Sequence, residues 1–260
     1  MSRIFITGSS DGLGLDAATS LIDQGHEVVG HARSADRAAG LRRAAPGLAD
    51  VAVGDLSSAA ATRSIADQVN ARGRFDAVIH NAGVGYREGR KVSTVDGHAY
   101  VLAVNVLAPY LLTALIERPA RLVYLSSGMH HGGTPSVDDL EWNRRRWNGT
   151  QAYSDSKLLD TVLAFAIARR WPDVLSNAVD PGWVATKMAG PGAPSAPGDF
   201  VLAHATQAWL AVSDDPAATV SGELFYHQRP REAHPAARSP QFQDDLLGAL
   251  ADLTGVKLPA

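Results

Sequence analysis

Short runs of consecutive apolar residues alternate along the chain with longer segments in which apolar residues recur at helical spacing. Runs such as "RLVYLS" at 121–126 are apolar on neighbouring positions, which is the pattern of a parallel strand covered on both faces. The pattern predicts strands at Arg3–Thr7, Glu27–Ala32, Asp50–Gly54, Phe75–His80, Arg121–Ser126, Val174–Val179 and Glu223–Tyr226.

Helical segments separate these strands. They are predicted at Gly12–Gln24, Ala35–Ala44, Ser57–Arg72, Val95–Ile116, Ser154–Arg170 and Ala203–Val212. Because strands and helices alternate, the fold class is α/β, a Rossmann-type doubly wound parallel sheet of about seven strands with helices on both faces. No repeat and no interdomain linker interrupts the pattern, which favours a single domain over residues 1–260.

Two irregular stretches stand out against this alternation, at 131–152 and at the Gly- and Pro-rich 189–199. Loops of this length in a compact domain are usually functional. We therefore expect substrate loops at approximately 129–152 and 183–203. The segment "QFQDDLLGALADL" at 241–253 predicts a further helix, which could cover the substrate side or a subunit interface.

Composition narrows the class of protein. Apolar residues make up 45% and charged residues 20% of the chain, as in an ordinary globular protein. A net charge of −3 gives no reason to expect nucleic acid or an acidic membrane as a partner, and the absence of cysteine excludes disulfides and thiolate metal sites. No apolar stretch approaches the ~18 residues of a membrane span, and the first strand begins too early to leave room for a signal peptide. We expect a cytoplasmic protein.

The segment "TGSSDGLG" at 7–14 carries the first chemical signal, because it joins the first strand to the first helix. Ligands of open parallel sheets bind beyond the carboxyl ends of the strands. Gly8 and Gly12 can adopt dihedral angles that other residues avoid, and Gly14 lets helix and strand approach closely. The helix N-terminus adds unpaired N–H groups that favour an anion. The segment predicts a pyrophosphate site; a glycine-rich turn without a ligand is the alternative.

The spacing T-G-x-x-x-G-x-G resembles that of the short-chain dehydrogenases/reductases, and further motifs occur in the order that this family has. They are "GDL" at 54–56, "NAG" at 81–83, "AVNVLAPYLLT" at 103–113, "LVYLSSG" at 122–128, "YSDSK" at 153–157 and "PGWVAT" at 181–186. Each motif is weak alone, but their joint occurrence in order is specific.

The resemblance implies four catalytic residues. Tyr153 would exchange a proton with the substrate oxygen, Ser127 would polarise the carbonyl, and Asn105 would anchor a water that relays protons to Lys157. Ser127 matches the family position better than its neighbour Ser126. Because Tyr153 and Lys157 are four residues apart on a helix, they share a face, and a cation there is expected to lower the pKa of the phenol.

The resemblance also implies the cofactor site. Asp55 would meet the adenine, Thr186 the nicotinamide carboxamide and Lys157 the nicotinamide ribose. The second strand ends in "GHARSADR", with no acid before Asp36, so NADP(H) is preferred and NAD(H) stays possible. Asp11 in the glycine loop weighs somewhat against NADP(H). The complete expected set is Thr7, Gly8, Ser10, Gly12, Leu13, Gly14, Arg33, Ser34, Asp55, Leu56, Asn81, Ala82, Gly83, Tyr153, Lys157, Pro181, Gly182, Val184 and Thr186.

The interval from Ser127 to Tyr153 is longer than in many family members and resembles that of the retinol-dehydrogenase-like branch. This similarity does not transfer a retinoid substrate. Trp142 and Trp147 in the interval could line an apolar substrate pocket or only pack the insertion onto the body. The adjacent His130 and His131 have no third ligand nearby, so no metal is expected.

The sequence thus predicts an NADP(H)-dependent oxidoreductase that interconverts a ketone or aldehyde and an alcohol, with an apolar small-molecule substrate. A non-catalytic NAD(P)-binding redox sensor is the alternative; such proteins generally lack the tyrosine or the lysine, and this chain has both. Monomer and homo-oligomer both stay open.

Overall fold

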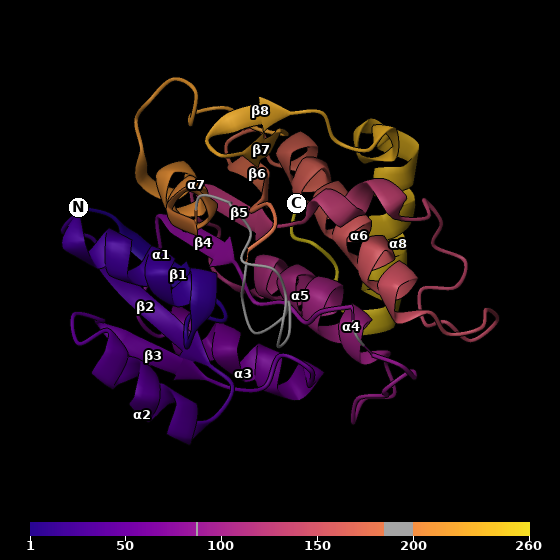
Figure 1. Ribbon diagram of the computed structural model, residues 1–260, viewed down its shortest axis with the longest axis horizontal. Coiled ribbons are helices and arrows are strands. Elements are labelled where there is room, and N and C mark those ends of the chain that lie inside the picture. Colours follow the sequence, from indigo (N-terminus) through magenta and orange to yellow (C-terminus); the bar gives the residue numbers. More distant parts are fainter. Residues whose placement is uncertain (87, 185–199) are drawn as a thin grey trace.

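The computed structural model describes residues 1–86, 88–184 and 200–260. At its centre lies one sheet of eight strands in the order β3-β2-β1-β4-β5-β6-β7-β8 (Figure 1). Every neighbouring pair is parallel except β7 and β8. The strands are β1 (Arg3–Ile6), β2 (Glu27–Ala32), β3 (Asp50–Val53), β4 (Ala77–His80), β5 (Arg121–Leu125), β6 (Leu175–Asp180), β7 (Leu224–Tyr226) and β8 (Arg229–Arg231).

The eighth strand was not among those predicted. It returns from β7 through a tight turn in which His227 and Gln228 have φ of 50° and 60°. Its three residues, Arg-Pro-Arg, are exposed and carry no apolar side chain, so hydrophobic patterning gives no signal for it. Pro230 is tolerated because β8 is an edge strand and needs no full ladder of hydrogen bonds.

Helices cover both faces of the sheet, as expected. They are α1 (Gly12–Asp23), α2 (Ala35–Ala44), α3 (Ala59–Asn70), α4 (Tyr100–Leu102), the π-helical η1 (Ala103–Leu107), α5 (Ala108–Leu115), the 3-10 helix η2 (Gly128–Gly132), α6 (Gly149–Arg170), α7 (Phe200–Val212), the 3-10 helix η4 (Pro235–Arg238) and α8 (Pro240–Thr254).

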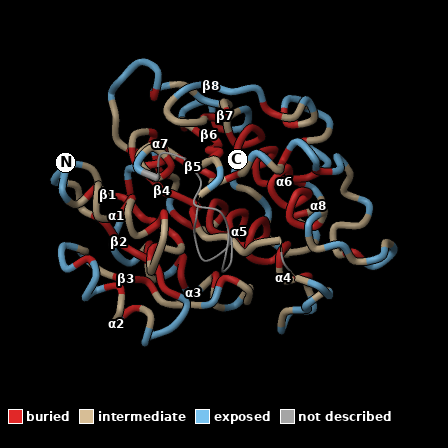
Figure 2. The backbone as a smooth tube through the Cα atoms, viewed as in Figure 1, coloured by how far each residue is buried: buried red, intermediate tan, exposed pale blue. Residues whose placement is uncertain are grey.

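Alternate strand residues supply the two layers of the core. Phe5 of β1 packs into the layer that contains α3, α5 and α6, whereas Ile4 and Ile6 pack with α1 and α7 on the other face. The predicted C-terminal helix exists as α8 and packs on α6 (Figure 1). Residues 152–167 of α6 are therefore buried on every side of the helix, which Figure 2 shows as a continuous buried stretch.

Two helix starts differ from the prediction by five residues. The helix expected from Val95 begins at Tyr100, because Asp96 and Gly97 form a turn in which Gly97 has φ of 86°. The helix expected from Ser154 begins five residues earlier, at Gly149, because the Asn148 side chain accepts a hydrogen bond from Gln151 N at 3.1 Å and caps it. The irregular stretch before Tyr153 is accordingly shorter than expected.

The order of the strands creates the position of the site. β1 lies between β2 and β4, so the connections on its two sides run in opposite directions. A crevice forms beyond the carboxyl ends of the strands at such a switch point. The glycine loop follows β1 and the "NAG" segment follows β4, so the fold brings these two motifs together there.

Candidate active site

The glycine loop has the backbone geometry that its sequence predicts. Gly8 and Gly12 have φ of 64° and 54°. A Cβ on Gly8 would lie 2.7 Å from the Ala82 Cα, and a Cβ on Gly14 would lie 2.5 Å from the Gly8 carbonyl oxygen. The loop can therefore hold no side chain at these positions, and its backbone lies tightly on the end of β4.

The N-terminus of α1 fits an anion. Its N-cap residue, Asp11, makes no side-chain capping hydrogen bond; its carboxylate accepts one from Arg37 Nη2 at 2.7 Å. The first N–H groups of the helix are thus not capped by that side chain and suit a pyrophosphate. Arg37 also donates through Nε to the Ser10 hydroxyl at 3.2 Å, so it offsets the charge of Asp11 beside the loop. Sequence reasoning missed Arg37.

His31 of β2, also missed, holds the loop from below. The Gly8 N–H donates to His31 Nδ1 at 3.0 Å, so Nε2 carries the proton and donates to the Gly54 carbonyl at 2.9 Å. Burial lowers the pKa of His31, which keeps the ring neutral and this pattern intact. A histidine in the middle of a strand gave no sign of this role.

Thr7 and Asn81 tie β1 to β4. The Thr7 hydroxyl accepts from Ala82 N at 3.0 Å, and the Asn81 amide donates to the Thr7 carbonyl at 3.0 Å and the Gly8 carbonyl at 3.2 Å. Gln207 of α7 donates to the Asn81 Oδ1 at 3.2 Å. These side chains shape the crevice by bonding one another.

The exposed end of β2 carries the residues expected to read the adenosine. Arg33 is exposed and lies near the hydroxyl of Tyr100, whose pKa is raised chiefly by burial and lowered in part by Arg33. Ser34 caps α2 by accepting from Arg37 N at 3.4 Å. Asp55 is also exposed there and accepts from Ser57 N at 2.9 Å. Two arginines thus lie at the same end of the crevice.

The remaining expected cofactor residues are placed unevenly. Leu13 and Leu56 are buried in the core, and Pro181, Gly182 and Val184 are half-buried after β6. A Cβ on Gly83 would lie 3.5 Å from Asn105 Oδ1 and 3.6 Å from Lys157 Nζ, so this glycine borders the catalytic group. Thr186 and most of the loop 183–203 lie outside the described residues.

Asn105 lies in the π-helical turn η1, a local feature often found at functional sites. Its Oδ1 accepts from Val84 N at 2.8 Å, and its Nδ2 donates to the Val84 carbonyl at 3.1 Å and to the Ser156 hydroxyl at 3.0 Å. The asparagine therefore joins the segment after β4 to the helix that carries Tyr153 and Lys157.

The two adjacent serines have different environments. Ser126 is buried, and its hydroxyl is bonded to Thr161 Oγ1 at 2.7 Å and to the Lys157 carbonyl at 3.2 Å. Ser127 is half-buried, accepts from Met129 N at 3.2 Å and lies near enough to the Tyr153 hydroxyl to lower the pKa of that phenol. Of the two, Ser127 is the one that faces the tyrosine.

His130 positions this serine. Its Nδ1 donates to the Ser127 carbonyl at 2.6 Å and its Nε2 accepts from His234 N at 3.2 Å. Burial lowers the pKa of His130 to about 4, so the neutral ring keeps both bonds. Its neighbour His131 lies against it, and among the described residues no group of acidic or histidine side chains is arranged to hold a metal ion.

The pKa of Tyr153 differs from the expectation. Burial raises it to about 12, although the nearby Ser127 hydroxyl acts to lower it. The Lys157 ammonium lies 6.0 Å from the centre of the phenol ring, donates to the Leu125 carbonyl and is 3.7 Å from the Asp160 carboxylate. The expected lowering of the pKa is wrong in this structure, chiefly because the phenol is buried; the Asp160 anion beside the lysine also acts to raise the pKa.

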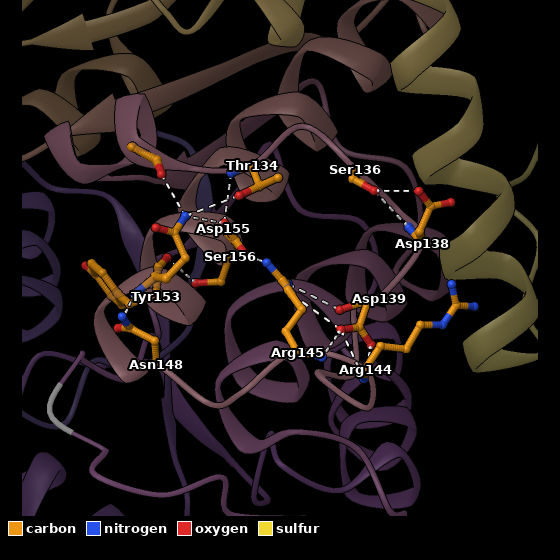
Figure 3. A network of polar contacts seen from close by, with 12 residues as sticks. Thr134, Ser136, Asp138, Asp139, Arg144, Arg145, Asn148, Tyr153, Asp155 and Ser156 are labelled. Carbon is orange, nitrogen blue, oxygen red and sulfur yellow. Dashed lines mark hydrogen bonds and ion pairs between the residues drawn. The ribbon is translucent and has the colours of Figure 1, made fainter.

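A polar network fixes the insertion between Ser127 and Tyr153 (Figure 3). Arg145 bonds Asp155 at 2.9 Å and lies 3.4 Å from Asp139, and its guanidinium covers the ring of Trp142 at 3.7 Å. Trp142 is only 7% exposed and packs among the residues around Tyr153. Trp142 thus packs the insertion onto the body, which is one of the two roles predicted for it.

The described part of the chain contains no helix that is both long and apolar enough to cross a membrane.

A family model described as short chain dehydrogenase matches residues 2–131. An uncharacterized oxidoreductase of Emericella nidulans is 45% identical over 265 residues, covering 100% of this chain and 99% of that protein.

Two further relatives span the chain. A short-chain dehydrogenase of Penicillium rubens, chyC, is 40% identical over 264 residues and covers 100% of both chains. Human retinol dehydrogenase 13 is 27% identical over 286 residues, covering 99% of this chain and 86% of that protein.

Solved structures share the architecture. A crystal structure of an uncharacterized protein from Mycobacterium paratuberculosis has a TM-score of 0.85 and 25% identity, covering 100% of this chain and 96% of that chain. A blue fluorescent protein from a metagenomic library, in complex with NADPH, has a TM-score of 0.67 and 22% identity, covering 86% of this chain and 95% of that chain.

Proposed function

The chain belongs to the short-chain dehydrogenase/reductase family, and because the relatives that span its whole length are named as oxidoreductases or dehydrogenases, we propose that it interconverts a ketone or aldehyde and an alcohol with NADP(H). One observation carries the proposal. Ser127, which lowers the pKa of Tyr153, lies with that tyrosine, Lys157 and Asn105 beside a glycine loop that suits a pyrophosphate.

The catalytic residues divide the chemistry among themselves. Bound in the crevice, NADPH would supply a hydride to the carbonyl carbon. The Ser127 hydroxyl donates a hydrogen bond to the carbonyl oxygen, and the phenol of Tyr153 gives that oxygen its proton. A raised pKa keeps Tyr153 protonated at neutral pH, which suits an acid in the direction of reduction. Oxidation of the alcohol uses the same groups in reverse.

Lys157 and Asn105 organise the site. Lys157 would hold the nicotinamide ribose, and Asn105 keeps the segment after β4 in contact with α6 through its bonds to Val84 and Ser156. We also propose that the segment from Pro181 lines the nicotinamide, with Thr186 at the carboxamide.

Preference for NADP(H) is supported by charge at the end of β2. Arg33 is exposed there, and Arg37 reaches Ser10 of the glycine loop. Guanidinium groups bind a phosphate dianion through charge-assisted hydrogen bonds, and no acid ends β2 that would repel it. Because Arg37 also pairs with Asp11, that acid does not stand as an uncompensated anion.

An apolar substrate is supported by the side chains next to Tyr153. Tyr86 meets its ring edge to face at 5.7 Å, and Val84, Met129 and Trp147 pack in the same cluster. Aromatic and apolar walls around a few polar groups are typical of small-molecule pockets. The loops at 129–152 and 183–203 would complete this wall, and we propose that the whole chain of 1–260 forms one domain around it.

The test is a screen of ketones, aldehydes and alcohols with NADPH and NADH, with cofactor binding followed by fluorescence. We expect tighter binding of NADPH and turnover of apolar ketones that Tyr153→Phe abolishes without loss of cofactor binding. Tight binding without turnover of any member of the panel would favour the redox sensor instead. Tighter binding of NADH would refute the cofactor preference.

A further inference from the structure

Asp160 is a buried acid that the proposed reaction does not use. It lies on α6 one turn after Lys157, and the side chains of the two residues are 2% and 4% exposed. The distance from the Lys157 Nζ to Asp160 Oδ2 is 3.7 Å. Oδ1 of Asp160 has no hydrogen-bond partner among the described residues. An anion in this position loses its hydration and regains little of it.

A second acid of the same helix shows what a purely structural carboxylate looks like. Asp155 accepts from Thr134 N at 2.8 Å, from Gln151 Nε2 at 2.8 Å and from Arg145 at 2.9 Å. Both of its oxygens are satisfied, and it fixes the insertion (Figure 3). Asp160 lacks such partners, so stabilising the fold does not account for its charge.

The groups around Asp160 make it the main source of negative charge on this side of the site. On β5 the phenol of Tyr124 bonds Thr113 Oγ1 at 2.7 Å, and on β4 the buried, neutral His80 lies tilted against that ring, with the two ring centres 4.7 Å apart. Burial is the main cause that raises the pKa of both Tyr124 and Tyr153, and the anion of Asp160 raises both further.

The other helix and strand neighbours act from elsewhere. Asp180 at the end of β6 also raises the pKa of Tyr153, but its carboxylate is paired with Arg231 at 2.9 Å. His130 of η2 is buried and neutral, and Arg238 of η4 lies over the ring of Phe165. On α8, Asp244 pairs with Arg169 at the far end of α6.

We infer that Asp160 is a positioning residue for the reaction, a buried counter-charge that holds the Lys157 ammonium at the wall of the site and sets the field that Tyr153 experiences. This inference rests on the proposed function. With the carboxylate in place, the lysine and the acid nearly cancel at the tyrosine, so Tyr153 stays protonated to high pH. Burial raises the pKa of Asp160 to about 7, so near neutral pH only part of the molecules carry the negative charge that acts on Lys157 and Tyr153.

The kinetic test uses Asp160→Asn, which keeps the shape and removes the charge. The acidic limb of kcat/KM for alcohol oxidation at saturating NADP+ reports the ionisation of the tyrosine. Because the lysine is then uncompensated, we expect this limb to move to lower pH by about one to two units, the size of one charge roughly 6–12 Å away at an effective dielectric near 20. An unmoved limb, or one moved to higher pH, would overturn the inference. Asp155→Asn is the matched control and should leave the limb in place.

A second measurement needs no turnover. An acid whose pKa is raised in the folded state stabilises the fold below pH ~4, and this contribution is lost as the pH rises through about 7. The wild type should therefore lose stability against Asp160→Asn between these values in urea unfolding at graded pH. Identical pH dependence of the two proteins would contradict a raised pKa of Asp160 in the folded state. If the wild type reduces no carbonyl at all, the proposed function fails, while this comparison still shows whether Asp160 is a buried acid that titrates near neutrality, which the inference requires.

Discussion

Substitution of the two adjacent serines, one at a time, should separate stability from catalysis. Ser127 faces Tyr153, and its hydroxyl is the one that we expect at the substrate oxygen. Removing one such hydrogen-bond donor costs roughly 10²–10³ in kcat. Ser127→Ala should therefore lose this much activity. Its free energy of unfolding should fall by only about 0.5 kcal/mol, because the side chain is half-buried and its hydroxyl caps only the short 3-10 helix η2.

Ser126→Ala should behave in the opposite way. Its hydroxyl bonds Thr161 Oγ1 and the Lys157 carbonyl in the buried interior, but Thr161 keeps its own bond to that carbonyl at 2.8 Å. Only one hydroxyl partner is lost, so the cost is about 1 kcal/mol of unfolding free energy. The turnover number should stay within a few-fold of the wild type.

The assay is steady-state reduction of a ketone found in the screen, with urea unfolding of the same preparations. A large loss of kcat in Ser126→Ala, with near-normal kcat in Ser127→Ala, would show that the assignment of the two serines is reversed.

Three further predictions follow from other parts of the molecule. Arg33→Ala should weaken NADPH binding by roughly 10- to 100-fold, the value of a charge-assisted hydrogen bond, and leave NADH binding unchanged in a fluorescence titration. Arg43→Ala, at the far end of α2, is the control. Equal weakening of the binding of both cofactors would argue against a phosphate contact. Leu250→Ala in α8 should lower the free energy of unfolding in urea by about 2–5 kcal/mol, because Leu250 is fully buried. Asp252→Ala, at an exposed position of the same helix, should lower it by less than about 0.5 kcal/mol. Losses of similar size in the two variants would mean that α8 contributes little to stability. Burial lowers the pKa of His80 to about 3, so the contribution of the neutral ring to the free energy of unfolding is complete above pH ~6.5. This contribution is lost as the pH falls toward 3, and the loss amounts to about 3 kcal/mol by pH 4. His80→Asn should flatten this part of the curve of stability against pH, and an unchanged curve would contradict a buried neutral ring.

Much of the fold could be predicted because its signals are local. Consecutive apolar runs marked all seven parallel strands, and the glycines of the first loop required dihedral angles that the structure contains. The strand β8 escaped because an exposed edge segment has no apolar pattern. The early start of α6 depends on a single capping side chain, Asn148, which hydrophobic periodicity does not report.

The site was predictable as far as motifs reach. The sequence placed Ser127, Tyr153 and Lys157 in motifs, and the fold brings their side chains together. The residues that support them were not predictable, because His31, Arg37 and His130 act through partners distant in the chain. Asp160 does have a sequence signal, because an acid within the apolar segment "LLDTVLAFA" is expected to be buried, and acids are rarely buried unless they are paired.

The most direct test of the account is a single turnover of enzyme-bound NADPH with a ketone substrate, in the wild type and in Tyr153→Phe. Cofactor and ketone affinities are measured for both proteins first. The account predicts equal affinities and a rate of NADPH oxidation that falls by at least roughly 10²-fold in the variant, the contribution of a positioned proton donor. A variant that binds normally and reacts at the wild-type rate would contradict the assignment of Tyr153 as the acid and, with it, the proposed chemistry.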